Sequence, residues 1–129
     1  MNKILVEISV GELLDKISIL EIKIEKIKDI KKLKFINDEY NVLKEQLAKN
    51  VKSDEKLNSL FKSLKEINKK LWVIEDDKRQ CEKDQNFSDK FIKLSRDVHF
   101  LNDDRAKIKL EINNYTGSKI KEVKEYTNY

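Results

Sequence analysis

Apolar residues recur at alternating steps of three and four along four separate stretches of this sequence. The stretches cover residues 10–27, 33–47, 57–81 and 91–115. A heptad repeat sustained this long is typical of helices that pack at shallow angles, as in coiled coils. The chain has no proline and only two glycines. The turn-rich β architectures, which need both residues, are therefore excluded.

Capping residues between the stretches set the expected helix boundaries. Ser9 and Glu12 fit a capping box, and acids follow Ser53 and Ser88 at further helix starts. Gly117 is a typical C-terminal stop. The first two stretches are out of phase, which favours a break capped by Asp29, although one bent helix also fits. The sequence predicts helices over 9–28, 30–50, 54–83 and 89–116.

Short loops between these helices favour antiparallel neighbours. We therefore expect an all-α fold in which two antiparallel helical hairpins form an elongated four-helix bundle. A short extended N-terminal segment over residues 4–8, rich in β-branched side chains, precedes it. A chain of 129 residues is enough for a single helical domain spanning residues 1–129.

Charge and cysteine content limit which kinds of partner and which cellular compartment we expect for this chain. The net charge is +4, and residues 16–34 alone carry a local +4. That segment has no arginine and fits no nucleic-acid motif, so we interpret it as a solvated helix face and expect no nucleic-acid partner. No apolar run is long enough to span a membrane, so no membrane partner is expected. Without an export signal, and with Cys81 as its one cysteine, the chain is expected in the cytoplasm.

Several apolar side chains fall outside the heptad seams, more than a slender bundle can bury. These side chains predict self-association into a homo-oligomer. There is one pair on each helix: Ile19 and Ile22, Phe35 and Val42, Trp72 and Val73, and Ile92 and Phe100.

Arg105 occupies a seam position between Leu101 and Ile108. A buried guanidinium without a partner is costly, so it must meet a carboxylate or a bound anion. The antiparallel hairpin offers no acid directly opposite. The expected partner is therefore Glu12 or Asp15 on the first helix, or a ligand.

Polar stripes flank the third and fourth seams and are expected to meet around Glu75, Arg79, Ser95 and His99. With Arg105 they form either a cationic pocket for a small carboxylate or phosphate, or a ladder of interhelical ion pairs. The candidate anion-binding residues are Lys16, Arg79, Arg96, His99, Asn102 and Arg105, and their candidate acidic partners are Glu12, Asp15 and Glu75.

We expect no metal site and no cofactor. His99 with Asp103 supplies too few ligands. Two acid pairs, Glu12 with Asp15 and Glu122 with Glu125, fit locally the metal motifs of all-helical nucleotide pyrophosphatases, but they lie at opposite ends of the chain. The sequence contains no phosphate-binding loop and no nucleophile motif.

Five segments resemble a bacterial and phage family of short all-helical proteins of unknown function. The segments are 4–7, 11–21, 71–77, 102–106 and 117–118, and together they extend over nearly the whole chain. The resemblance implies no activity and no catalytic residues. With the lysine-, asparagine- and isoleucine-rich composition of an AT-rich genome, it fits a marine bacterium or its phage.

Two functional hypotheses follow, and whether the chain is an enzyme stays open. The first is a self-associating helical interaction or scaffold protein. The alternative is a small enzyme or binder with an interhelical cationic pocket, similar to the all-helical chorismate mutases. Three or more cationic side-chain groups at one cavity would favour the pocket. Cationic groups that are each paired with a carboxylate would favour the scaffold.

Overall fold

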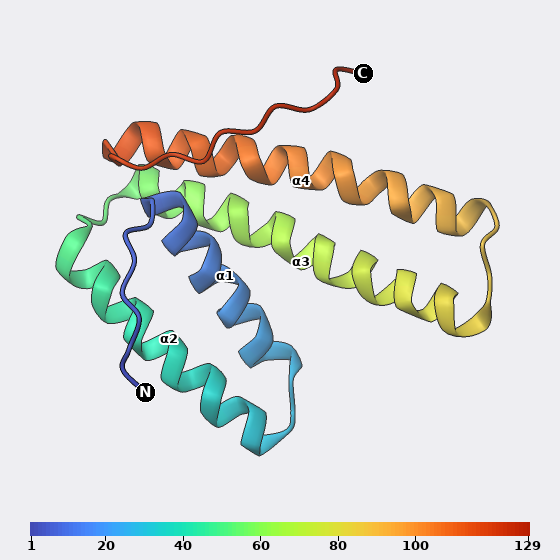
Figure 1. Cartoon of the computed structure of the whole chain (residues 1–129), viewed down its shortest axis with the longest axis horizontal. Helices are drawn as coiled ribbons and strands as arrows, with labels where there is room; N and C mark the ends of the chain where they lie inside the picture. Colours follow the sequence, from blue (N-terminus) through green and yellow to red (C-terminus); the bar gives the residue numbers. More distant parts are fainter.

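The computed structural model describes residues 1–129 and confirms an all-helical fold of four helices without strands. The helices are α1 (Val10–Lys26), α2 (Ile30–Asn50), α3 (Glu55–Asp84) and α4 (Asp89–Thr116). In Figure 1, α1 and α2 form one antiparallel hairpin, and α3 and α4 form a longer one. The helix pairing is that of a four-helix bundle.

Side-chain caps explain most of the boundaries. Ser9 accepts a hydrogen bond from the Glu12 amide, and Asp29 accepts from the first amides of α2. The Asp29 cap makes α1 and α2 two helices rather than one bent helix. Asp54 caps α3 by accepting from the Leu57 amide. Gly117 ends α4 at a φ of 68°, in the left-handed region that favours glycine.

Helix α1 is the central element, because it packs against each of the other three helices. The core lies where Leu14 of α1 meets Leu57, Leu64 and Ile112 of the longer hairpin. Helix α2 has no buried residue and lies along α1. It reaches the core only near its C-terminal end, through Leu47 and the adjacent Val51.

The longer hairpin extends well past the end of α1 (Figure 1). We call residues 73–100 the distal hairpin. Its only buried residue is Cys81. Its seam residues Ile74, Leu94 and Val98 stay half-buried, because α3 and α4 have only each other there.

One of the off-seam pairs is not where the sequence suggested. Ile22 is only 1% exposed and Ile19 is half-buried, so the expectation that they form a surface patch is wrong. The central position of α1 explains this, since neighbouring helices surround it. Trp72 is likewise half-buried, whereas the other off-seam residues are exposed: Phe35, Val42, Val73, Ile92 and Phe100.

Both ends of the chain lie outside the helices. Residues 1–9 run beside α2 and expose Ile4, Leu5 and Val6. Residues 118–129 turn back along α4 (Figure 1). None of the four helices combines the length and apolar character needed to cross a membrane.

Candidate functional site

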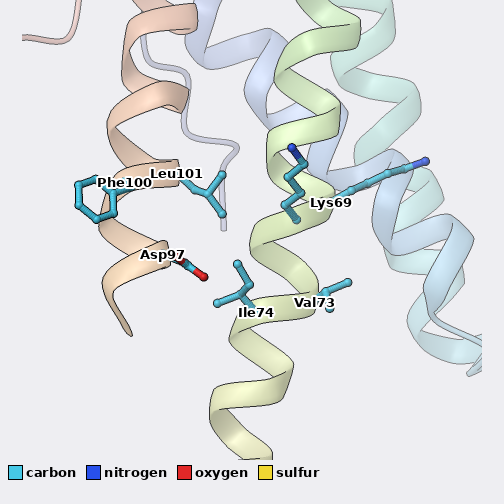
Figure 2. A pocket seen from close by; sticks show the side chains of 7 residues that line it. Lys69, Val73, Ile74, Asp97, Phe100 and Leu101 are labelled. Carbon is cyan, nitrogen blue, oxygen red and sulfur yellow. The ribbon is translucent and has the colours of Figure 1, made fainter. Parts of the chain in front are cut away.

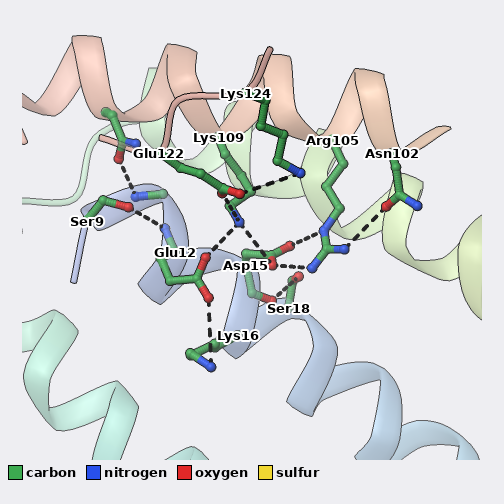
Figure 3. A network of polar contacts seen from close by, with 12 residues as sticks. Ser9, Glu12, Asp15, Lys16, Ser18, Asn102, Arg105, Lys109, Glu122 and Lys124 are labelled. Carbon is green, nitrogen blue, oxygen red and sulfur yellow. Dashed lines mark hydrogen bonds and ion pairs between the residues drawn. The ribbon is translucent and has the colours of Figure 1, made fainter. Parts of the chain in front are cut away.

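A cluster of polar side chains lies between α1, α3 and α4, near the N-terminal end of α1 (Figure 3). We call it the polar cluster. It consists of Glu12, Asp15 and Ser18 from α1, Asn68 from α3, Arg105, Lys109 and Asn113 from α4, and Glu122 from the C-terminal tail.

Asp15 is the centre of the cluster, with a side chain only 2% exposed. Arg105 donates two hydrogen bonds to it, from Nε to Oδ1 at 2.9 Å and from Nη2 to Oδ2 at 2.5 Å. Asn68 donates to Oδ1 at 2.9 Å, and Lys109 Nζ lies 3.6 Å from Oδ2. The expected carboxylate partner of Arg105 on the first helix is thereby confirmed, and it is Asp15.

Lys109 provides the second link between α1 and α4. Its side chain is 10% exposed and donates to Glu12 Oε2 at 2.7 Å and to Glu122 Oε2 at 3.2 Å. Glu12 also lies 3.8 Å from Lys16 Nζ. Glu12 is thus engaged with two lysines, and its side chain does not complete the capping box by returning to Ser9.

The first amides of α1 are bonded by side chains from the end of α4 and the tail. The Gly11 amide donates to Asn113 Oδ1 at 2.7 Å, and the Val10 amide donates to Ser118 Oγ at 3.2 Å. Gly11 is needed for this close approach, because a Cβ there would lie 2.6 Å from the Lys109 carbonyl oxygen. Two of the unpaired amides at this helix start are therefore satisfied by tertiary contacts, and Ser9 satisfies that of Glu12.

The ionic state of the cluster follows from these contacts. Burial opposes ionisation of Asp15, but hydrogen bonds from Arg105 and Asn68 outweigh it and hold the pKa of Asp15 below its ordinary value. Burial also opposes the charge of Lys109, yet the bond to Glu12 and the charge of Asp15 hold its pKa above the ordinary value. Both groups are therefore charged near neutral pH.

Every buried polar side-chain atom of the chain has a partner. The buried atoms of the cluster are therefore all hydrogen-bonded, and its acids lie within ion-pair distance of its bases. Such an arrangement fixes the position of α1 on the longer hairpin. No group of three or more His, Cys, Asp or Glu side chains is placed to hold a metal ion.

The structure brings only part of the candidate set together. Arg105 and Asn102 meet, with Arg105 Nη1 3.4 Å from Asn102 Oδ1, and Lys16 joins the margin of the cluster through Glu12. Arg79 is exposed and lies 3.6 Å from Glu75 on its own helix. Three of the six candidate anion-binding residues, Arg79, Arg96 and His99, thus do not join Arg105 at one site.

Arg96 and His99 are exposed residues of α4 in the distal hairpin. The Arg96 guanidinium is 5.9 Å from the centre of the Phe100 ring. The His99 ring contacts the rings of Phe100 and Tyr129. These contacts are aromatic, and neither residue reaches the polar cluster.

Sequence reasoning did not place Ser18, Asn68, Asn113 or Glu122 in a common site. The available signal was the four-residue spacing of Arg105, Lys109 and Asn113, which puts all three on one face of α4. That face packs against α1, and its polar side chains form the polar cluster at this end of the hairpin.

A second feature is an open hollow of about 590 Å³ between α3 and α4 (Figure 2). Ile74 and Leu101 point toward each other across it, and Val73 and Phe100 line its edges. Val73 is 50% exposed and Phe100 is 40% exposed. This hollow lies where the distal hairpin begins, and its lining is mainly apolar.

Comparison with known proteins gives one family. A model described as a family of unknown function (DUF6165) matches residues 4–129. No curated protein and no solved structure matches the chain.

Proposed function

We propose that this chain, which belongs to the DUF6165 family, is a helical scaffold protein that associates with copies of itself through the distal hairpin. The observation that carries the proposal is the half-buried seam of that hairpin. Ile74, Leu94 and Val98 repeat as a coiled-coil core does, yet no third helix of the chain covers them. Apolar seams of this kind are favoured to find a partner helix.

A second copy is the partner that this sequence supplies. Two hairpins of equal length can cover each other as a four-helix bundle, with a two-fold axis between them. The apolar lining of the hollow, with Val73 and Phe100 at its edges, would become part of this contact.

The state of the candidate cations supports a scaffold rather than a pocket. Arg105 is paired with Asp15, Arg79 with Glu75 and Lys16 with Glu12. Cationic heads engaged by carboxylates of their own chain are not arranged to receive a small anion.

Light scattering on the purified chain tests the assembly at micromolar concentration. We expect a mass that is a multiple of the 15.4 kDa chain. Replacing the two edge residues, Val73→Ser with Phe100→Ser, should return the mass to that of one chain. A matched control, Phe35→Ser with Val42→Ser, removes exposed apolar side chains from α2 and should leave the assembly intact. A single-chain mass for the unmodified protein contradicts the proposal, and so does equal loss of assembly in the two double variants.

The alternative, a binder or enzyme for a carboxylate or phosphate metabolite, makes a different prediction. Such a ligand would raise the melting temperature of the chain, and Arg105→Lys would abolish that rise because lysine lacks the bidentate fork. A thermal-shift screen with anionic metabolites measures this directly.

We further infer that residues 1–129 act as a single domain in the cytoplasm of a bacterium or phage-infected cell. The one cysteine, Cys81, is buried and free, which suits a reducing compartment. Limited proteolysis that cut the chain into two stable fragments would argue against a single domain.

A further inference from the structure

The turn between α1 and α2 carries a concentrated run of lysines. We call residues 23–34 the lysine tip. It forms the free end of the shorter hairpin, away from the ends of α3 and α4 (Figure 1). It holds six lysines against two acids: Lys23, Lys26, Lys28, Lys31, Lys32 and Lys34, with Glu25 and Asp29.

Neither acid is available to neutralise these lysines. Glu25 is held by Lys65 Nζ at 2.9 Å and by Lys69 Nζ at 3.3 Å, both on α3. Asp29 Oδ1 accepts the amides of Lys31 and Lys32 as the cap of α2. The ion pairs of the chain are all made by other basic residues. Even with both acids counted, the tip carries a net charge of +4, equal to that of the entire chain.

Large apolar side chains project from the same region. Ile30 is 83% exposed at the start of α2, and Phe35 is 75% exposed at its second turn. The charged neighbours Lys31 and Lys32 lie between them in sequence and are also exposed. Exposed lysines around apolar side chains are the pattern with which peripheral proteins bind the surface of a lipid bilayer.

We propose that the lysine tip docks the protein onto a membrane surface that contains anionic phospholipids. The lysines lie near the headgroup phosphates, and Ile30 and Phe35 enter the boundary between headgroups and acyl chains. No spanning helix is required, so the docking is compatible with the helices described above. The sequence expectation of no membrane partner rested on the absence of a span, and surface docking departs from it.

The composition of the tip favours a membrane over nucleic acid. The tip has no arginine, the residue that most often reads base edges through a bidentate contact. An exposed Ile30 gains from entering a lipid interface and gains little on a phosphate backbone.

Co-sedimentation with vesicles tests the proposal. We expect the unmodified protein to sediment with vesicles of phosphatidylcholine plus phosphatidylglycerol, and to stay in solution with pure phosphatidylcholine. Raising the salt concentration should release it, since screening weakens exposed charges. Equal binding to both vesicle types, or binding to neither, overturns the proposal.

Charge variants with a matched control locate the surface. The triple variant Lys28→Gln, Lys31→Gln and Lys32→Gln should lower the partition onto anionic vesicles by about a hundredfold. The control Lys83→Gln, Lys90→Gln and Lys107→Gln removes the same charge from exposed lysines of α3 and α4 and should bind nearly as the unmodified protein does. Equal losses of binding in the two variants would show that only net charge matters and would refute the lysine tip as the docking surface.

The apolar contribution has its own test. Ile30→Ser with Phe35→Ser should weaken vesicle binding by a similar factor at low and at moderate salt, because insertion does not depend on screening. The loss in the triple lysine variant should instead shrink as the salt concentration rises. Circular dichroism on each variant checks that it is folded. Binding to a labelled duplex DNA or RNA that the triple variant loses, without binding to vesicles, would assign the tip to nucleic acid instead.

Discussion

The two ends of the α3–α4 hairpin have the same kind of apolar repeat but very different environments. Near α1, Leu64 is fully buried, and the α4 residue Ile112 is buried with it. In the distal hairpin, Leu94 continues the same pattern on α4, yet it is only half-buried. The difference comes from α1, which covers one end of the hairpin and stops short of the other.

A heptad pattern thus states which face of a helix is apolar, and the number of neighbours decides how much of that face is buried. The same holds for the polar stripes beside the seams. At the α1 end, the stripe of α4 becomes the polar cluster around Asp15. In the distal hairpin, Arg79 and Arg96 stay on the surface.

The largest effect is expected for the pair that fixes α1 at its end of the hairpin. Arg105→Met should lower the free energy of unfolding by about 3–5 kcal/mol, because it leaves the carboxylate of Asp15 buried with Lys109 as its only charged neighbour. Denaturant unfolding measures this. The double variant Arg105→Met with Asp15→Asn should recover part of the loss, since the buried charge is then removed. A double variant less stable than the single one would contradict this account.

A matched pair of leucines compares the two ends directly. Leu64→Ala should lower the free energy of unfolding by roughly 2–5 kcal/mol, as expected for a fully buried leucine. Leu94→Ala in the distal hairpin should cost clearly less in a dilute, single-chain sample. At concentrations where copies associate, the cost of Leu94→Ala should grow. Equal costs at low concentration would mean that α1 does not determine the difference.

The two glycines sharpen the comparison further. Gly11→Ala should cost about 1–3 kcal/mol, because the new Cβ would meet the Lys109 backbone oxygen and push α1 away from α4. Gly117→Ala meets no atom within 4 Å, but its φ of 68° is strained for alanine, which costs about 1 kcal/mol. Thermal unfolding should therefore rank Gly11→Ala as the more harmful. The reverse ranking would show that α1 can shift without loss.

The smallest effect is the dependence on pH. The pKa of Asp15 is lowered in the folded chain. Its stabilising contribution is therefore complete above the pKa of Asp15 in the unfolded chain, which is about 4. It is lost as the pH falls through the lower folded value. The free energy of unfolding should thus fall on acidification, and less steeply in Asp15→Asn. Parallel slopes for the two proteins would mean that the Asp15 charge is not coupled to folding.

Sequence alone predicted the helices well because their ends are local events. Ser9, Asp29 and Gly117 act within one turn of the backbone, so their positions set boundaries close to those observed. The predicted 9–28 and 54–83 became Val10–Lys26 and Glu55–Asp84. The shift at α3 arises because Asp54 caps that helix and stands outside it.

The site was less predictable because it depends on where α1 lies along the hairpin. A seam arginine requires a buried acid, and that requirement pointed to α1. The choice of Asp15 over Glu12 could not be read from spacing, since both lie on the same face and Glu12 pairs with Lys109. The expectation that Arg79 and His99 lie close to Arg105 assumed that the two polar stripes contact each other along the whole hairpin.

The bonds that hold the start of α1 have a consequence for how the protein is made. The amides of Val10 and Gly11 are bonded to Ser118 and Asn113, which lie 108 and 102 residues later in the chain. On the ribosome, α1 and α2 emerge long before those partners exist. The leading amides of the first helix therefore stay in water until almost the last residues appear, and its contact with the end of α4 is among the last to form.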